Sequence, residues 1–264
     1  MILIDLYLRI GSAICRKLAS RSCSIVLNFV PNESSGRAEA LATELRSSYK
    51  VKSIQVQADM ASETGPQHII NIAKDASSPT TPTTSSNTFQ IDIIINNSGT
   101  GANFSIEECT PDNFARMYNL NTRGPLLLMK AALPYLPHDR SGRVVNVSSV
   151  ASTLSSMTRT WARELAERAT VNAINLGLVA TELWDLASPE LKTAASVAYK
   201  LTPLAAVRGD LDSADVLREA AAQGGGWPAY VHEIAALVAL LCSTDSAWST
   251  GSVLCANGGM KFTS

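Results

Sequence analysis

Residues 91–99 read IDIIINNSG, a short run of β-branched residues that ends in two asparagines, a serine and a glycine. An apolar run of this kind is typical of a strand in a parallel sheet, because such strands are covered by helices on both faces. Similar runs alternate with longer amphipathic stretches along the whole chain, which is the pattern of repeated strand–helix–strand units. The sequence therefore predicts an α/β fold with a doubly wound parallel sheet of about seven strands and helices on both faces.

The expected elements follow from this alternation. The expected strands are Ile2–Ile4, Ser24–Phe29, Ser53–Gln57, Ile91–Asn96, Arg143–Val147, Thr170–Ile174 and Ser252–Ala256. The expected helices, each apolar on one face, are Gly11–Ser20, Gly36–Ser48, Thr64–Asp75, Pro111–Leu136, Met157–Ala169 and Ala229–Ser243. Thr110-Pro111-Asp112 is the clearest helix start, with a hydroxyl to cap and proline at the first helical position. We expect one domain over residues 1–264.

Two stretches interrupt the alternation. Residues 77–88 (SSPTTPTTSSNT) are Ser, Thr or Pro at every position except Asn87, which predicts a mobile surface loop. Residues 184–227 form a longer excursion before the last helix, and Ser188-Pro189-Glu190 marks a helix start near its beginning. A helix placed there would cover the carboxyl ends of the strands like a lid. The alternative is a surface insertion without a role.

Composition excludes several classes of protein. The 264 residues are 46% apolar and 6% aromatic, and 22 Lys and Arg balance 23 Asp and Glu, which argues against a nucleic-acid partner. The longest apolar run, Ile234–Cys242, is about half of what a bilayer requires, so we expect no membrane span. The five cysteines include no Cys-x-x-Cys pair and indicate reduced thiols in a cytoplasmic protein. The three histidines lack metal-ligand spacing, so no metal site is expected.

Five motifs occur in a fixed order along the chain. They are Asn96-Asn97-Ser98-Gly99, Asn121-Thr122-Arg123-Gly124, residues 142–149 (GRVVNVSS), residues 175–181 (NLGLVAT), and Thr250-Gly251 followed by Gly258-Gly259. In this order and spacing the chain resembles the short-chain dehydrogenase/reductase family, and within it the ketoreductase branch. The resemblance implies a Rossmann-type fold, a homo-oligomer, and NADPH-dependent reduction of a small-molecule ketone or the reverse oxidation of an alcohol.

The resemblance also implies roles for individual residues. Ser149 resembles the serine that hydrogen-bonds the substrate carbonyl, and Asn121 resembles the asparagine that supports a proton-relay water. Asp59 resembles the contact to the adenine ring. The other expected cofactor-binding residues are Ile10, Gly11, Asn97, Gly99, Arg123, and the pair Val179 and Thr181 that would fix the nicotinamide carboxamide.

The end of the second strand bears on the choice of cofactor. It reads Asn28-Phe29-Val30, without an acid where a carboxylate would hold a ribose 2′-hydroxyl. This favours NADP over NAD, although Glu33 lies nearby in the sequence.

The chain departs from the family at the phosphate-binding loop. The family has Thr-Gly-x-x-x-Gly-x-Gly, whereas residues 4–11 read IDLYLRIG and keep only the last glycine. Side chains then stand where the backbone should approach the pyrophosphate, and Asp5 adds a like charge that Arg9 offsets only in part. We therefore expect weakened cofactor binding.

A second departure concerns the catalytic pair. The family has Tyr-x-x-x-Lys about 13 residues after the serine, where the tyrosine is the general acid and the lysine lowers its pKa and holds the nicotinamide ribose. Here position 162 is alanine, and none of the six tyrosines is followed by lysine four positions later. The sequence reads as if this segment had been cut out between about Ser156 and Met157.

This loss leaves several alternatives open. Enough chain remains between the strand near Val147 and the one near Thr170 for a parallel crossover, so we expect the fold to persist without its proton donor. The nearest polar side chains, Ser156, Thr158 and Arg159, are poor acids at neutral pH. The chain is then a reductase, an impaired family member that acts as a scaffold or cofactor sensor, or a truncated or mis-spliced product.

Overall fold

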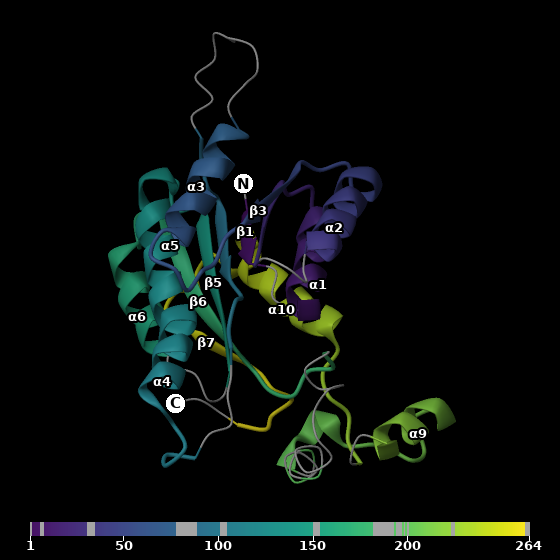
Figure 1. Ribbon diagram of the computed structural model, residues 1–264. Helices are drawn as coiled ribbons and strands as arrows, with labels where there is room; N and C mark the ends of the chain where they lie inside the picture. Colours follow the sequence, from purple (N-terminus) through teal and green to yellow (C-terminus); the bar gives the residue numbers. More distant parts are fainter. Residues whose placement is uncertain are drawn as a thin grey trace.

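The computed structural model contains one sheet of seven parallel strands among its described residues, in the order β3-β2-β1-β4-β5-β6-β7 (Figure 1). The structure describes residues 2–5, 8–30, 35–77, 89–100, 105–149, 154–181, 193, 197, 199, 201–222 and 225–261. The expected doubly wound α/β fold is thereby confirmed, since every strand pairing is parallel.

The strands agree closely with the sequence prediction. They are β1 (Ile2–Asp5), β2 (Ile25–Phe29), β3 (Ser53–Gln57), β4 (Ile93–Asn96), β5 (Gly142–Ser149), β6 (Ala169–Leu176) and β7 (Val253–Ala256). Each expected strand is present, and its ends differ from the prediction by at most two residues. The central strands β2 and β4 are buried along their whole length, as expected for strands covered on both faces.

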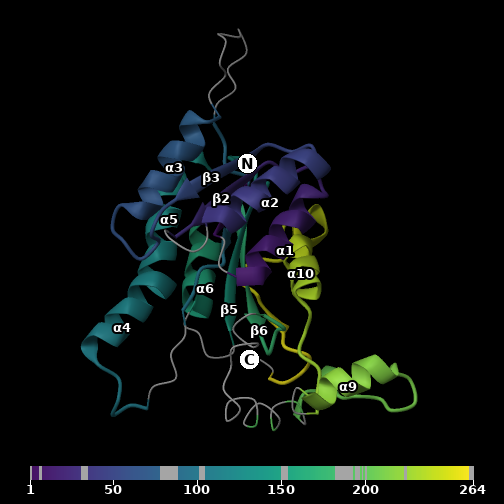
Figure 2. The same ribbon diagram turned by 45° about the vertical axis from the view of Figure 1, so that its right-hand side comes forward.

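Helices cover both faces of the sheet (Figures 1 and 2). One face carries α1 (Leu8–Ala19), α2 (Ser35–Ser48) and α10 (Val231–Leu241), and the other carries α3 (Gly65–Asp75), α5 (Gly124–Ala132) and α6 (Leu154–Glu164). Successive residues of a strand pack against opposite helical layers, because side chains alternate between the two faces of a sheet. Leu27 accordingly packs with Ile14 and Ile234, whereas Val26 packs in the layer of Ile69 and Trp161.

Two helices differ from their predicted ranges by three residues or more at one end or both, while α2, α3 and α10 differ by one or two residues. Helix α1 begins at Leu8 and not at Gly11, so Gly11 is buried inside the helix. Helix α6 covers Leu154–Glu164, and the predicted extension to Ala169 is wrong. Ala169 instead starts β6, because its position in register with Gly142 places it in the sheet.

The long helical stretch predicted for 111–136 is divided by a π-helical turn. It contains α4 (Pro111–Tyr118), the π-turn Asn119–Arg123, α5, and a 3-10 turn at Leu133–Tyr135. The predicted cap is confirmed, since the Thr110 side chain accepts a hydrogen bond from the backbone of Asn113 at 3.2 Å. Pro125 has no N–H to donate to the carbonyl of Asn121, and its ring needs room there, which a wider turn supplies.

The two predicted interruptions are described only in part. Ser77 ends the turn after α3, where its hydroxyl donates to Ala73 O at 2.6 Å, and residues 78–88 lie outside the described residues. The predicted helix start at 188–190 also lies outside them. The described part of the excursion holds a 3-10 turn at Pro203–Ala205 and α9 (Ala214–Ala222). Helix α9 stands apart from the two helical layers in both views (Figures 1 and 2).

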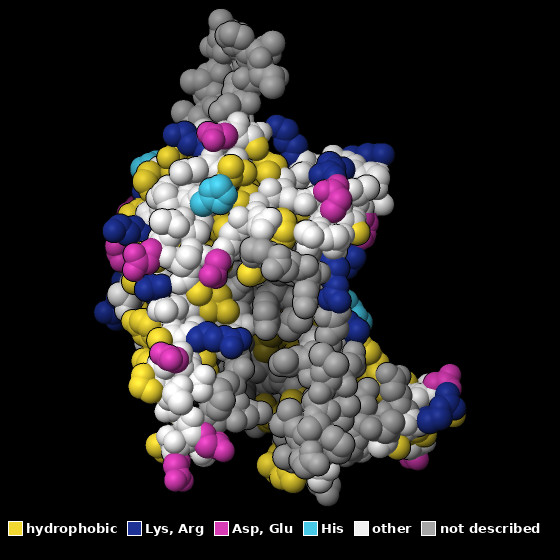
Figure 3. Space-filling model, viewed as in Figure 1, with side chains coloured by type: hydrophobic (Ala, Val, Ile, Leu, Met, Phe, Trp, Pro, Cys, Tyr) yellow, Lys and Arg dark blue, Asp and Glu magenta, His cyan; other side chains and the backbone are white. Residues whose placement is uncertain are grey.

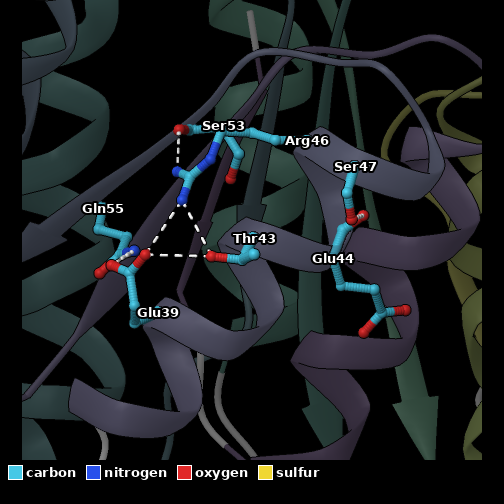
Figure 4. A network of polar contacts seen from close by, with 7 residues as sticks. All are labelled: Glu39, Thr43, Glu44, Arg46, Ser47, Ser53 and Gln55. Carbon is cyan, nitrogen blue, oxygen red and sulfur yellow. Dashed lines mark hydrogen bonds and ion pairs between the residues drawn. The ribbon is translucent and has the colours of Figure 1, made fainter.

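A polar network covers the edge strand β3 (Figure 4). Arg46 of α2 donates to the carbonyl of Ser53 at 3.2 Å and to Glu39 at 3.1 Å. Gln55 of β3 donates to the same carboxylate at 2.6 Å, and this hydrogen bond with that from Thr43 holds the pKa of Glu39 below its ordinary value. These side chains fix α2 against an edge that would otherwise present open backbone groups.

Candidate active site

The carboxyl edge of the sheet collects most of the predicted site residues. The chain leaves β3 at one end of the sheet and returns as β4 on the other side of β1, which creates the crevice where parallel sheets bind ligands. Asp59 follows β3, Asn97 and Gly99 follow β4, Ser149 ends β5, and Thr181 follows β6. Segments distant in the sequence thus meet at one edge.

Asp59 lies in a tight turn that Arg123 holds in place. The Asp59 carboxylate accepts from the backbone N–H of Ala61 at 2.8 Å, and its carbonyl accepts from the backbone of Ser62 at 3.1 Å. Arg123, at the end of the π-turn, donates through Nη2 to the carbonyl of Ala61 at 2.7 Å, and its Nη1 lies 3.7 Å from a carboxylate oxygen of Glu63. The guanidinium therefore binds the turn that carries the predicted adenine contact.

Two glycines allow this turn to approach its neighbours. A Cβ on Gly65 would stand 2.0 Å from the carbonyl oxygen of Asp59, and one on Gly124 would stand 2.5 Å from the carbonyl oxygen of Met60. Both contacts are to backbone, which cannot rotate away. Gly124 belongs to the Asn-x-x-Gly motif, whereas Gly65 belongs to none of the five motifs.

Asn121 fixes the loop that follows β4. Its amide oxygen accepts from the backbone N–H of Thr100 at 2.8 Å, and its amide nitrogen donates to the carbonyl of Thr100 at 2.7 Å. Both ends of the amide are thereby engaged with the backbone of one residue, Thr100. The role visible in the structure is to position the end of β4, close to Asn97 and Gly99, and the amide oxygen keeps one lone pair for a further donor.

A buried side-chain network that the sequence motifs did not predict lies between β4, β5 and α6. Asn96 donates to Asn146 Oδ1 at 2.7 Å, and Asn146 donates to Thr158 Oγ1 at 2.8 Å. Thr158 in turn donates to the carbonyl of Leu154 at 2.9 Å. The network joins β4, β5 and α6, and Asn146 and Thr158 are completely buried. The available signal was an asparagine at an inward position of each of two apolar strands.

Ser149 ends β5 and is exposed at the carboxyl edge. The residue 13 positions later, Ala162, lies elsewhere. Ala162 is buried, and its Cβ would be 3.4 Å from a Cβ placed on Gly251. Gly251 precedes β7 and therefore lies at the amino ends of the strands, away from the carboxyl edge. The first turn of α6, which does lie near Ser149 in the sequence, contains Leu154, two serines and Met157 and no ionisable side chain.

The segment after β6 pairs with the residues before α10, and the turn after β7 contacts the excursion. Val179 pairs with Ala229 in an isolated parallel bridge, and Ala180 donates to the carbonyl of Ala229 at 2.9 Å. Thr181 is buried at this point. The excursion is attached close by, because Leu204 donates its N–H to the carbonyl of Gly258 at 3.1 Å in the turn after β7.

The connection from β1 to α1 is short. Strand β1 ends at Asp5 and α1 begins at Leu8, so only residues 6 and 7 join them, and both lie outside the described residues. Arg9 is exposed in the first turn of α1, while Ile10 is half-buried. The predicted loss of the glycine-rich loop corresponds here to a connection of two residues.

Neither Tyr199 nor any described cluster of titratable side chains supplies the missing proton donor or a metal site. Burial raises the pKa of Tyr199, on the excursion, to about 12, which makes this phenol a poor proton donor at neutral pH. Within the described ranges, no group of three His, Cys, Asp or Glu side chains is arranged to hold a metal ion, and no helix has the length and hydropathy to cross a membrane. On the face seen in Figure 3, basic and acidic side chains are interspersed.

Comparison with known proteins identifies the family. Residues 9–156 match the model of the short chain dehydrogenase family. The chain is 36% identical to an L-xylo-3-hexulose reductase of Hypocrea jecorina, over 96% of this chain and 93% of the relative. It is 38% identical to an L-xylulose reductase of Aspergillus niger, over 96% of this chain and 94% of the relative.

Solved structures show the same fold. A metagenomic blue fluorescent protein in complex with NADPH superposes with a TM-score of 0.77 at 24% identity, over 98% of this chain and 96% of the other. An angucycline C-6 ketoreductase with bound NADP gives a TM-score of 0.76 at 23% identity, over 98% and 94%. The chain belongs to the short-chain dehydrogenase family of oxidoreductases.

Proposed function

We propose that this chain binds NADP(H) at the carboxyl edge of its sheet. By descent it is a reductase of a small-molecule ketone, or in the reverse direction a dehydrogenase of the corresponding alcohol. The observation that carries the proposal is the meeting of Asp59, Asn97, Asn121 and Ser149 at that edge, in a chain related to ketose reductases. In this proposal Ser149 donates a hydrogen bond to the substrate carbonyl. Asn121 fixes the β4 loop and offers its second lone pair to a water.

The residues at the adenine and nicotinamide ends of the proposed site suit the cofactor better than those at the pyrophosphate between them. The turn of Asp59, held by Arg123, supports the adenine end, and Val179 with Thr181 supports the carboxamide end. Arg37, exposed in the first turn of α2 just beyond β2, is in the right part of the fold for a 2′-phosphate, which supports NADP over NAD. The two-residue connection before α1 has no glycine to let the backbone approach a pyrophosphate, so we propose weakened binding there.

When bound, NADPH supplies the hydride; the protein must then supply a proton to the carbonyl oxygen. The first turn of α6 has no group able to do this, and the spacing at which the family has its tyrosine falls on a buried alanine at the other edge. Loss of a positioned general acid typically lowers the rate by about 10²–10⁴-fold. This observation favours a second candidate function, that of a family member which binds the cofactor without efficient turnover, as a scaffold or sensor.

The alignments agree with a deletion. The alignment to the L-xylo-3-hexulose reductase spans 286 positions, whereas this chain has 264 residues, so at least 22 positions of the alignment face a gap in this chain. The family match ends at residue 156, where the sequence predicts the missing segment to begin. The third candidate is a truncated or mis-spliced product of a competent enzyme. The gap in the alignment and the end of the family match support this candidate as much as they support an impaired family member.

The decisive experiment compares binding with turnover. The purified chain is titrated with NADPH by fluorescence and then tested for reduction of an activated ketone. We expect binding with turnover at least about 100-fold below that of an intact L-xylulose reductase measured alongside. Turnover at the rate of that relative would refute the argument from the missing tyrosine, and absence of binding would refute the proposed cofactor site.

An insertion variant tests the cause. A segment with Tyr-x-x-x-Lys placed after Ser156 should restore turnover, while the same segment with Phe-x-x-x-Met should not, although both restore the length of the helix. If both insertions remain inactive and NADPH still binds weakly, the short β1–α1 connection is the principal defect. We also expect a homo-oligomer, which light scattering on the eluted peak would test.

A further inference from the structure

The face of the sheet under α6 carries polar side chains at two successive levels. Asn96 and Asn146 are register partners on β4 and β5, and Ser148 and Asn175 are register partners on β5 and β6. Side chains alternate along a strand, so Ser148 lies on the same face as Asn146, whose amide contacts Thr158 of α6. Ser148 and Asn175 therefore stand side by side, one step nearer to the carboxyl edge.

The two levels differ in their hydrogen bonding. At the first level Asn146 has both Asn96 and Thr158 as partners, and only Asn96 Oδ1 has none among the described residues. At the second level Ser148 Oγ and Asn175 Oδ1 are inaccessible to solvent and have no hydrogen-bond partner among the described residues. Ser148 is 6% exposed and Asn175 is 4% exposed. Two adjacent buried polar atoms without partners are costly, and such groups usually serve a ligand or an ordered water.

The start of α6 explains why the second level has no hydrogen-bond partner from the helix. The helix returns from the carboxyl edge, and its Thr158 reaches the level of Asn146. Leu154, four residues earlier, is about 6 Å nearer to that edge, and Ser148 is about 6.6 Å beyond Asn146 in the same direction. The helix therefore begins at the level of Ser148 and Asn175, and its N-terminal turn adds the positive end of the helix dipole beside them.

The chemistry of these groups selects one kind of ligand atom. Asn175 Oδ1 only accepts, so the ligand group must donate a hydrogen bond, while the Ser148 hydroxyl both donates and accepts. The helix N-terminus disfavours an ammonium group, and a carboxylate has no proton to donate to Asn175. We propose that Ser148 and Asn175 form a subsite for a neutral hydroxyl group, contributed by a polyhydroxylated ligand or by a buried water. The first source rests on the proposed function, and the second does not.

The experiment has a binding arm and a crystallographic arm. Affinity for L-xylulose and for xylitol is measured by calorimetry on the full chain, with and without NADPH, for the parent and for Ser148→Ala and Asn175→Leu. We expect each substitution to weaken polyol binding about tenfold, as for the loss of one hydrogen bond, with NADPH affinity unchanged. Ser53→Ala is the matched control, because Ser53 Oγ is also buried with no partner among the residues described but lies at the start of β3. This substitution should leave polyol binding unchanged.

The crystallographic arm uses the parent chain without polyol, so it does not depend on the folding of a variant. An ordered water bonded to both Ser148 and Asn175, without polyol binding in solution, assigns the subsite to water. Polyol affinity that is equal in the parent and both variants, together with no such water, overturns the proposal. Failure of NADPH to bind refutes the proposed function but leaves the crystallographic result valid.

Discussion

Substitution of Thr158 by valine tests the network that attaches α6 to the centre of the sheet. Thr158 is completely buried, accepts from the Asn146 amide at 2.8 Å and donates to the carbonyl of Leu154 at 2.9 Å. Valine has nearly the same shape, so Thr158→Val removes these two hydrogen bonds without opening a cavity. The amide nitrogen of Asn146 is then left buried without a partner.

The expected loss follows from two opposing effects. A buried donor without a partner costs about 1–3 kcal/mol. The methyl group that replaces the hydroxyl returns up to about 0.8 kcal/mol of burial energy. We therefore expect the free energy of unfolding to fall by about 1–2 kcal/mol, which for a protein of this size lowers Tm by about 2–8 °C.

Urea unfolding followed by circular dichroism measures this loss, with Thr160→Val as the matched control. The Thr160 hydroxyl makes the same bond to the carbonyl four residues earlier, at 3.3 Å to Ser156, but it is exposed and contacts no asparagine. The control should change the free energy of unfolding by less than about 0.5 kcal/mol. Equal losses in Thr158→Val and Thr160→Val, or none in either, would show that the buried network does not hold α6.

Three further predictions concern packing and charge. Gly65→Ala should lower the free energy of unfolding by about 1–3 kcal/mol in urea unfolding, because its Cβ would stand 2.0 Å from a backbone oxygen, whereas Gly36→Ala, with nothing within 4 Å, should be neutral or slightly stabilising. Arg143→Met should cost about 1–3 kcal/mol in the same assay, since this buried guanidinium donates to three backbone carbonyls, and an unchanged midpoint would contradict that role. The hydrogen bonds from Arg16 hold the pKa of Glu44 below its ordinary value, so Glu44→Gln should lower stability at pH 7 by at most about 1 kcal/mol. That difference should vanish as the pH falls through the lowered pKa, because the ionised carboxylate makes the favourable contact; a difference independent of pH would refute the assignment.

The arrangement of the strands could be predicted from the sequence because burial on both faces leaves a strong pattern. Runs such as IDIII and RVVNV are mostly β-branched on both faces, and the observed strand ends lie within two residues of the predicted ones. The helices were less well predicted at their ends. The start of α1 at Leu8 and the end of α6 at Glu164 differ from the predicted Gly11 and Ala169, because apolar periodicity shows that a helix exists but does not mark where it begins or ends.

The candidate site divides in the same way. Motifs indicated Asn121 and Arg123, but their partners Thr100 and Ala61 come from loops that only the folded chain brings close. The hydroxyl subsite was invisible for a further reason. Ser148 belongs to a recognised motif, yet its neighbour Asn175 lies 27 positions later and joins it only through the register of β5 with β6.

The order and identity of the residues were enough to predict the fold class, to indicate the family and to show that the chain has no Tyr-x-x-x-Lys segment. The location of the loss depends on how the chain is folded. Ala162 lies at the amino ends of the strands, away from Ser149, and α6 starts beside Ser148 and Asn175, whose buried oxygens have no hydrogen-bond partner among the described residues. The physical reason is that hydrogen bonding and burial depend on distances between segments, and those distances are set by strand register and helix packing.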